Sequence, residues 1–488
     1  MVQSNMPGEQ LQQTARKRPN PVLSEVEGGE RPGGPPAGGR TALAAWDHAY
    51  LWHPFTQMQE WLGSEPLIIA GGDGAYLIDT EGHRYLDGVS SLWCNVHGHR
   101  RPELDAALRG QLDAVAHSTL LGLANVPAVE LAKRLVEITP PSLTKVFYSD
   151  AGATAVEIAL KMAFQYWQLQ GDAHRTQFAA LTESYHGDTL GAVSVGYSET
   201  FHRFFRPLLF PCHKLNPPHV YRWQRGLSAD DALQAAVDEA AALFRRCGAQ
   251  LAGLIIEPLM QGAAGMWAQP PGYVRALRDL TTRHGVLLIC DEVATGFGRT
   301  GKMFAVDHAG VQPDILCLGK GISAGYLPLA ATLTTEEIFG AFLGPYEEFK
   351  AFFHGHTYTG NALACAVGLA SLDLFEKHHV VETVQRQAQQ LAERLQRDCI
   401  GLAHVGDVRQ WGLMAGIELV QEETTRRPYP IADRTGARVT TEARRNGVIL
   451  RPLGDVVVLM PPLCITEAEI NLLCGATCKA IVRITEGC

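Results

Sequence analysis

Residues 316–321 read Leu-Cys-Leu-Gly-Lys-Gly and end an apolar strand at Lys320. A second apolar strand, Val-Leu-Leu-Ile-Cys at 286–290, ends at Asp291. Runs of this kind alternate with helical patterns from about residue 100 to 365. Buried strands interleaved with helices predict an α/β fold, with a mostly parallel central sheet covered on both faces.

The rest of the chain follows the same pattern around these two strands. Further predicted elements are strands at 146–149, 178–181 and 251–257, a helix at 153–170, a hairpin at 71–82, helices at 362–377 and 381–397, strands at 412–420 and 456–460, and a last helix from about 466. We expect a disordered extension over 1–40, which is rich in Pro, Gly, Glu and Gln. An N-terminal segment, 41–95, is expected to join a smaller α+β domain at 366–488, and a large cofactor-binding domain spans 96–365.

Composition excludes several classes of partner. The net charge is −9, so no basic surface is expected for nucleic acid or for an anionic membrane. No apolar run approaches the roughly 18 residues of a membrane span, and no secretory signal precedes the globular part. The eleven cysteines form no C-x-x-C pair. We therefore expect a soluble cytoplasmic protein with free thiols and without a metal site.

The amine of Lys320 and the carboxylate of Asp291 are the pair that pyridoxal 5′-phosphate (PLP) chemistry requires. A lysine forms a Schiff base with the aldehyde of this cofactor, and a carboxylate keeps the pyridine nitrogen protonated, so that the ring accepts electrons. The sequence therefore predicts PLP as the cofactor, with Lys320 and Asp291 as catalytic residues.

Three other segments fit a PLP site. Gly152 and Ala153 stand at a strand-to-helix junction, where free amides and the helix dipole favour a phosphate. Tyr185 follows the strand at 178–181, and its ring could lie over a flat cofactor. Thr357, in the polar segment 354–361, offers another phosphate donor.

Two features permit other interpretations. Residues 296–302 match most of a phosphate-binding G-x-x-x-x-G-K loop, but Met303 follows in place of the hydroxyl residue that binds magnesium. A nucleotide-binding protein built on Gly296–Lys302 is one alternative function, and a cofactor-binding scaffold without turnover is another.

Arg451 is a lone cation in an apolar segment. An arginine in such a segment either makes a structural ion pair or binds the carboxylate of a substrate.

From about Trp46 to the C-terminus the chain resembles the fold-type-I, class-III aminotransferases. The run Asp-Glu-Val-Ala-Thr-Gly-Phe-Gly-Arg-Thr-Gly at 291–301 is similar to their signature segment. More specific are His-Pro-Phe-Thr-Gln-Met at 53–58, Tyr-His-Gly-Asp-Thr at 185–189 and Arg-Pro at 451–452. These resemble the members that aminate 8-amino-7-oxononanoate in biotin biosynthesis.

The resemblance implies a role for each matching position. Lys320 carries the cofactor, Asp291 binds its ring nitrogen, and Tyr185 is the third catalytic residue. Gly152 and Ala153 hold the cofactor phosphate. Other implied contacts are made by Trp93, Tyr185, Gly355 and Arg451 with substrate, and by His356 and Thr357 with the phosphate bound in the other subunit. The resemblance thus implies a homodimer with shared active sites.

The implied reaction converts 8-amino-7-oxononanoate to 7,8-diaminononanoate. The chain departs from the family pattern at Ala153, where many relatives have serine, and at His356, where proline is frequent. Leu92 replaces the first of two tryptophans found in many members that use S-adenosyl-L-methionine, and it resembles the subset that uses lysine. Both amino donors therefore stay open. Another class-III ω-amino acid aminotransferase is a further alternative.

Overall fold

The computed structural model describes residues 39–487, which fall into two compact units that divide between Ile68 and Ile69. The first unit contains helices α1 (Gly39–Tyr50) and α2 (Met58–Leu62). The extension expected over 1–40 lies outside the described residues, apart from the last two, which begin α1.

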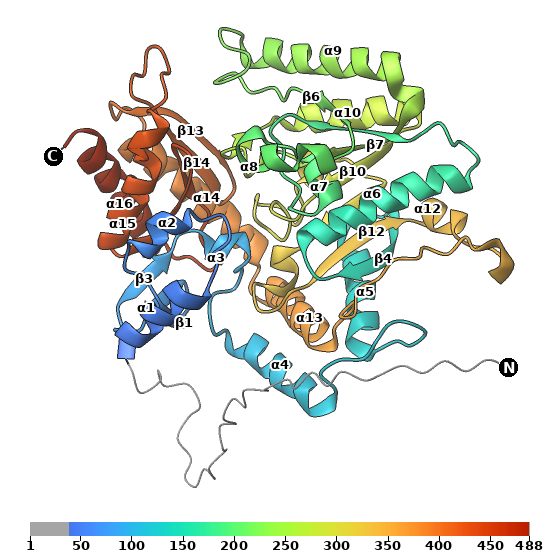
Figure 1. Ribbon diagram of the computed structural model, residues 1–488, viewed down its shortest axis with the longest axis horizontal. Coiled ribbons are helices and arrows are strands. Elements are labelled where there is room, and N and C mark those ends of the chain that lie inside the picture. The colour runs from blue at the N-terminus through green and yellow to red at the C-terminus, as the bar shows by residue number, and fades with distance from the viewer. Residues whose placement is uncertain (1–38, 488) are drawn as a thin grey trace, which may run out of the picture. The chain divides into compact units, whose positions relative to one another are not determined.

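A seven-stranded sheet forms the centre of the second unit (Figure 1). In spatial order its strands are β4 (Leu143–Ser149), β12 (Ala330–Thr335), β11 (Ile315–Leu318), β10 (Leu287–Asp291), β7 (Leu251–Ile256), β5 (Gln177–Leu181) and β6 (Cys212–Leu215). Only β12 runs antiparallel to its neighbours within this sheet. The α/β fold with a mostly parallel sheet is therefore confirmed.

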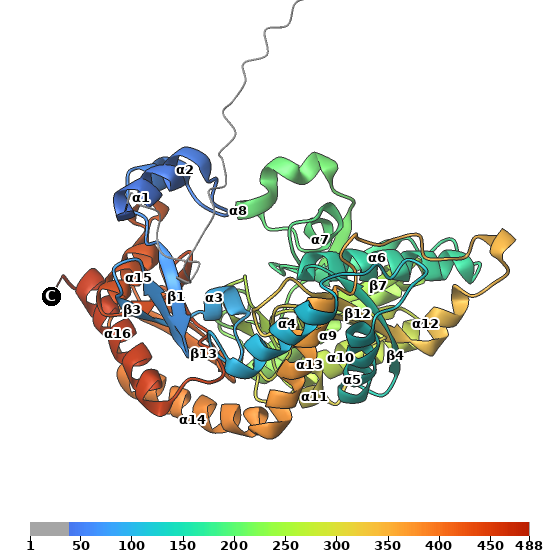
Figure 2. The ribbon, with the colours of Figure 1, turned by 90° about the horizontal axis from the view of Figure 1, so that it is seen from below.

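The central strands β7, β10 and β11 are buried on both faces, which explains why they are apolar at nearly every position. Successive side chains of a strand point to opposite faces. Leu288 and Cys290 accordingly belong to one apolar core, and Leu287 and Ile289 to another. Helix α6 (Gly152–Leu169) packs in the second core. The helices packed in the first are α5 (Val126–Ile138), α9 (Ala229–Cys247), α10 (Pro271–His284) and α13 (Ala362–Lys377). Figure 2 shows α6 on one side of the sheet and α5, α10 and α13 on the other.

Two smaller sheets contain the remaining long strands. An antiparallel sheet consists, in order, of β13 (Val405–Trp411), β14 (Met414–Leu419), β17 (Val456–Leu459) and β16 (Arg451–Leu453). The other consists of β1 (Ile69–Asp73), β2 (Tyr76–Asp79), β3 (Arg84–Asp87) and β15 (Val448–Ile449). Since β3 pairs with β15, segments from both ends of the chain share one sheet. The domain boundaries at 95 and 365 stay a prediction.

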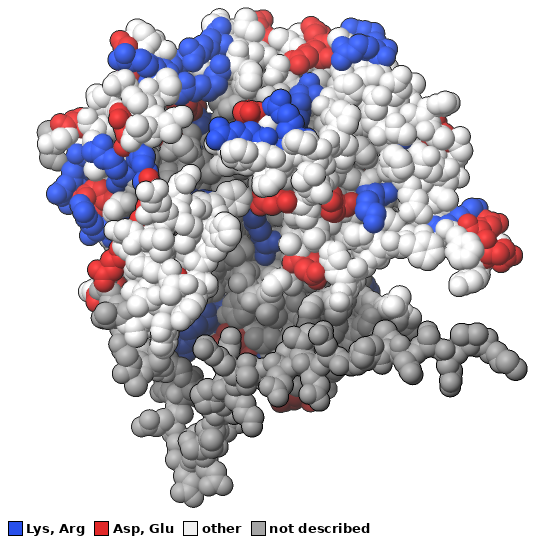
Figure 3. Space-filling view, in the orientation of Figure 1, with Lys and Arg blue, Asp and Glu red and all other residues white. Residues whose placement is uncertain are grey.

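The other elements connect and cover these sheets. Helices α14 (Val380–Asp398), α15 (Thr435–Arg445) and α16 (Glu467–Thr485) belong to the C-terminal part. The shorter or peripheral elements are α3 (Ser90–Trp93), α4 (Pro102–Ala114), α7 (Leu190–Val195), α8 (Glu199–His202), α11 (Val306–Ala309), α12 (Glu336–Ala341) and the strand pair β8 (Met260–Gln261) and β9 (Trp267–Ala268). Among the described residues, no helix has the length and apolar character to cross a membrane. On the face drawn in Figure 3, basic and acidic side chains are interspersed.

The structure corrects the expectation that all cysteines are free thiols. Cys399 and Cys478 form a disulfide, with their Cα atoms 5.9 Å apart. Cys399 directly follows α14 and Cys478 lies within α16, and these two helices pack together. Because the pair is separated by 79 residues, its closeness depends on tertiary packing, and cysteine spacing gave no sign of it.

Candidate active site

Four polar side chains gather at the carboxyl ends of neighbouring strands of the large sheet. Lys320 follows β11, Asp291 ends β10, Glu257 follows β7, and Tyr185 comes shortly after β5. The register pairs Asp291 with Cys317, so the lysine and the aspartate extend from adjacent strands. The carboxyl edge of an open parallel sheet is where such folds bind ligands. The sequence-predicted pair therefore meets at the expected edge of the sheet.

The amine of Lys320 is enclosed by the protein. Its Nζ lies 4.5 Å from the centroid of the Trp93 ring, and Trp93 is itself buried. Burial lowers the pKa of Lys320 below its ordinary value, and the nearby carboxylates of Asp291 and Glu257 oppose this change. A buried amine with a lowered pKa is available as a nucleophile and proton carrier closer to neutral pH than a solvated lysine.

Asp291 is fixed by two hydrogen bonds. Its Oδ2 lies 2.7 Å from Nδ1 of His186, and its Oδ1 accepts a hydrogen bond from the amide of Val293 at 3.0 Å. Both side chains are buried. The Nε2 atom of His186 is also buried and has no partner within the described part of the chain. His186 was not assigned a role from the sequence, although it directly follows Tyr185.

Glu257 is the second functional candidate that sequence reasoning missed. Its two carboxyl oxygens accept hydrogen bonds from the amides of Tyr185 and Gly262, each at 3.0 Å. Burial raises the pKa of Glu257 to about 7. The signal that could have found it is its position: like Asp291, it is an acid at the end of an apolar strand.

Gly152 and Ala153 form the first turn of α6, where amides lack intrahelical acceptors. The backbone is tightly packed there. A Cβ atom at Gly152 would lie 2.5 Å from Cγ1 of Val293, and one at Gly187 would lie 2.3 Å from Cβ of Ala153. A Cβ atom at Gly319 would lie 3.3 Å from Cα of Gly152. The helix terminus is thus adjacent to the residue that precedes Lys320, as a phosphate site serving this lysine requires.

Tyr185 and Arg451 are close enough to interact electrostatically. The Tyr185 hydroxyl donates a hydrogen bond to Asp188 at 2.7 Å, and the ring lies nearly parallel to that of His202. Burial raises the pKa of Tyr185 above its ordinary value, and the hydrogen bond to Asp188 adds to this effect. The positive charge of Arg451 opposes the rise. Within residues 39–487 the half-buried Arg451 makes no ion pair or side-chain hydrogen bond, so its guanidinium is available for an anionic ligand.

Gly355, His356 and Thr357 lie in a loop that approaches the start of α6 in the same chain. Nδ1 of His356 is 2.9 Å from Oδ2 of Asp150, while Gly355 and Thr357 are exposed. Their expected contact with a phosphate in a second subunit stays a prediction.

The alternative phosphate loop at Gly296–Lys302 is packed inside the protein. Residues 296–301 are buried, and the Arg299 guanidinium donates hydrogen bonds to the carbonyl oxygens of Pro461 and Asn95. A Cβ atom at Gly296 would lie 2.8 Å from the carbonyl oxygen of Glu292. These glycines permit close packing of the chain, and a nucleotide-binding role finds no support in this geometry.

The residues present fit PLP. A half-buried lysine, a buried carboxylate fixed by a histidine, and a tight helix terminus lie at one edge of the sheet. Lys320 would hold the aldehyde carbon, Asp291 the ring nitrogen, and the first turn of α6 the phosphate. No metal is needed for this arrangement.

Comparisons with known proteins agree with this site. The family model "Aminotransferase class-III" matches residues 58–481. The chain is 56% identical to the adenosylmethionine-8-amino-7-oxononanoate aminotransferase of Nitratidesulfovibrio vulgaris, covering 93% of this chain and 84% of the relative. The crystal structure of the enzyme of the same name from Methanocaldococcus jannaschii aligns with a TM-score of 0.87 at 49% identity, covering 91% of this chain and 99% of that one. An amine transaminase from an uncultivated Pseudomonas species, solved in its PLP-bound form, aligns with a TM-score of 0.86 at 39% identity, covering 89% and 99%.

The chain belongs to the class-III aminotransferases. These are PLP-dependent transaminases, so the enzyme class and the cofactor predicted from Lys320 and Asp291 are confirmed.

Proposed function

We propose that this protein transfers an amino group to 8-amino-7-oxononanoate and so forms 7,8-diaminononanoate in biotin biosynthesis, the reaction of diaminopelargonic acid synthase. One observation carries this proposal. Relatives from five organisms, 49–56% identical over at least 88% of this chain, are all named for this reaction. The amino donor is S-adenosyl-L-methionine or lysine.

Lys320, Asp291 and His186 provide the chemistry. PLP, when bound, supplies an electron sink for the carbon that exchanges its amino group. Lys320 would hold the cofactor and would carry a proton to and from the reacting carbon, a task that its lowered pKa supports. Asp291 keeps the ring nitrogen protonated, and His186 keeps Asp291 in place.

Arg451 is the residue of the site that we expect to bind the carboxylate of the substrate. We assign it to the carboxylate of 8-amino-7-oxononanoate, because it is half-buried and close to Tyr185. A guanidinium binds a carboxylate through two parallel hydrogen bonds. Tyr185 and Trp93 would then border the apolar chain of the substrate between Arg451 and Lys320.

The exposed aromatic residues around Gly355 support a homodimer with shared active sites. The loop exposes large apolar side chains, namely Leu343, Tyr346, Phe349, Phe353 and Tyr358. Exposed apolar side chains gathered in one segment are typical of an interface between subunits. Burying it in a second copy would bring His356 and Thr357 to the partner, so we propose that they complete the partner's phosphate site. Light scattering at micromolar concentration tests the dimer. The cytoplasmic location stays a prediction.

A single-turnover reaction tests the proposed function. Protein loaded with pyridoxamine phosphate should convert about one equivalent of 8-amino-7-oxononanoate to 7,8-diaminononanoate, while pyruvate should react far more slowly. A faster reaction with pyruvate than with 8-amino-7-oxononanoate would favour the amine transaminase function of the Pseudomonas relative. Supplying S-adenosyl-L-methionine or lysine to the PLP form then identifies the donor.

A further inference from the structure

The four residues of α3 have left-handed backbone conformations. Their φ angles are 51° at Ser90, 48° at Ser91, 70° at Leu92 and 73° at Trp93, and none of the four is glycine. For residues with a Cβ atom this region is unfavourable, and a run of four persists only where the surroundings impose it.

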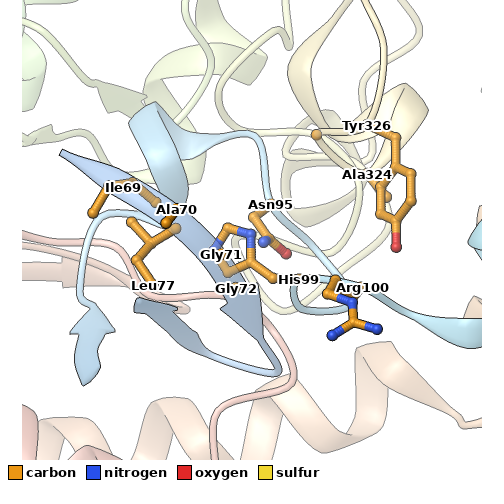
Figure 4. Close-up of a pocket in the computed structure, with 11 residues that line it drawn as sticks. Ile69, Ala70, Gly71, Gly72, Leu77, Asn95, His99, Arg100, Ala324 and Tyr326 are labelled. Atoms are coloured by element: carbon orange, nitrogen blue, oxygen red, sulfur yellow. The ribbon is translucent and has the colours of Figure 1, made fainter. Parts of the chain in front are cut away.

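The Ser90 hydroxyl donates a hydrogen bond to the carbonyl of Met460, and the buried carboxylate of Asp87 restrains Ser91 in the middle of the turn. Its Oδ1 accepts a hydrogen bond from the amide of Ser91 at 2.9 Å, and its Oδ2 accepts one from the Ser91 hydroxyl at 2.8 Å. Oδ2 also lies 3.0 Å from Nε2 of His99. The His99 ring lines an open pocket of about 430 Å3 and lies beside Gly72 of the β1–β2 hairpin (Figure 4). Asp87 is thus held by His99 next to the β1–β2 hairpin, and it holds Ser91 in the middle of the turn through two hydrogen bonds.

The end of the turn contacts the catalytic lysine. Trp93 donates its amide hydrogen to the carbonyl of Val89 at 2.8 Å, and its ring packs against Gly262, where a Cβ atom would lie 3.0 Å from Cζ3. The same ring lies 4.5 Å from Nζ of Lys320. Only Leu92 separates Ser91, which Asp87 restrains, from Trp93, so a change in the backbone at Ser91 displaces the Trp93 ring.

We propose that Asp87 is a positioning residue: it imposes the left-handed turn at 90–93 and thereby holds the Trp93 ring against the amine of Lys320. The proposal rests on the proposed function only in taking Lys320 as the amine that binds the cofactor. A residue that merely stabilises the fold would act in the same way whatever the backbone conformation of Ser91. The effect of Asp87 on Trp93 instead depends on the positive φ angle of Ser91.

Glycine substitution tests this dependence. Asp87→Ala removes the restraint. Adding Ser91→Gly in the same chain lowers the cost of the left-handed conformation without restoring any hydrogen bond. The matched control is Asp87→Ala with Cys94→Gly, since Cys94 directly follows the turn and has a right-handed φ of −106°. Each protein is also made with Trp93→Phe, so that the emission of Trp93 is obtained by difference.

Two readouts that need no substrate are compared. We expect the Trp93 emission of Asp87→Ala to shift to longer wavelength, and its rate of cofactor capture by Lys320 to fall about tenfold or more, since misplaced groups lose rate steeply. Ser91→Gly should restore both, and Cys94→Gly neither. If Asp87→Ala does not fold, Asp87→Asn takes its place in all three proteins.

An unchanged emission in the Asp87 variants, or equal rescue by glycine at either position, would overturn the proposal. An error in the proposed function would leave these results unaffected, because neither readout involves 8-amino-7-oxononanoate or an amino donor.

Discussion

Oδ2 of Asp291 lies 2.7 Å from Nδ1 of His186, and both side chains are buried at the carboxyl edge of the large sheet. The histidine therefore pairs with one carboxyl oxygen, while the Val293 amide pairs with the other. Together the two contacts fix the orientation of the Asp291 carboxylate.

The first prediction concerns this pair. Asp291→Asn should lower kcat by about 100-fold or more, because an amide cannot keep the ring nitrogen protonated. His186→Gln should have a smaller effect, since the carboxylate itself remains. Steady-state kinetics of both variants measure which of them loses more kcat. As a control, Asp314→Asn changes a carboxylate at the opposite end of the same strands, where it accepts a hydrogen bond from Leu288, and it should affect stability alone. Equal kinetic losses in all three variants would contradict the assignment.

The second prediction concerns Arg451. Arg451→Ala should weaken binding of 8-amino-7-oxononanoate by about 2–4 kcal/mol, because a desolvated carboxylate would lose its partner. Stopped-flow measurement of each half-reaction separates the two substrates. If only the donor half-reaction is impaired, Arg451 does not bind the oxononanoate. Arg438→Ala, a substitution elsewhere in the C-terminal part, serves as the matched control.

The third prediction concerns pH. Burial raises the pKa of Glu257 from 4.5 to about 7, so between these values the folded protein binds more protons than the unfolded chain. The free energy of unfolding contributed by Glu257 should therefore fall as the pH rises through this window, by about 3 kcal/mol at about 1.4 kcal/mol per pKa unit. Urea unfolding of the cofactor-free protein and of Glu257→Gln, at pH 5, 6, 7 and 8, measures the difference.

Glu257→Gln also removes one acceptor for the amides of Tyr185 and Gly262. That loss is a constant offset and does not depend on pH. A difference between the two proteins that stays the same from pH 5 to 8 would show that burial does not raise the pKa of Glu257.

The fourth prediction concerns the disulfide between Cys399 and Cys478. Thiol titration in denaturant should find two fewer thiols before reduction than after it. Cys399→Ser with Cys478→Ser should lower the free energy of unfolding by about 2–4 kcal/mol, the usual effect of losing a native disulfide. Cys212→Ser, at a free thiol, is the control. An unchanged thiol count on reduction would contradict the pairing.

The sequence alone predicted the features that depend on local pattern. The apolar runs at 286–291 and 315–318 became adjacent strands, and the helix expected at 153–170 is observed at Gly152–Leu169. Both succeeded because burial on two faces and helical periodicity leave strong local signals. Lys320 and Asp291 could be paired because both end buried strands.

The features that were missed depend on contacts between distant segments. The contacts of Glu257 and His186 depend on the order of the strands in the sheet, where β7 lies between β10 and β5, and the disulfide depends on the packing of α14 on α16. The left-handed turn at 90–93 contains no glycine, so its sequence carries no sign of the positive φ angles that tertiary contacts impose.

The most direct measurement locates the cofactor. The protein is loaded with PLP, reduced with borohydride, digested and analysed by mass spectrometry. We predict one modified peptide, labelled at Lys320. Lys320→Ala should lack the visible absorbance of lysine-bound cofactor at about 420 nm, and Lys302→Ala should retain it. A label on any other lysine, or a Lys320→Ala protein that still captures PLP with full absorbance, would contradict it.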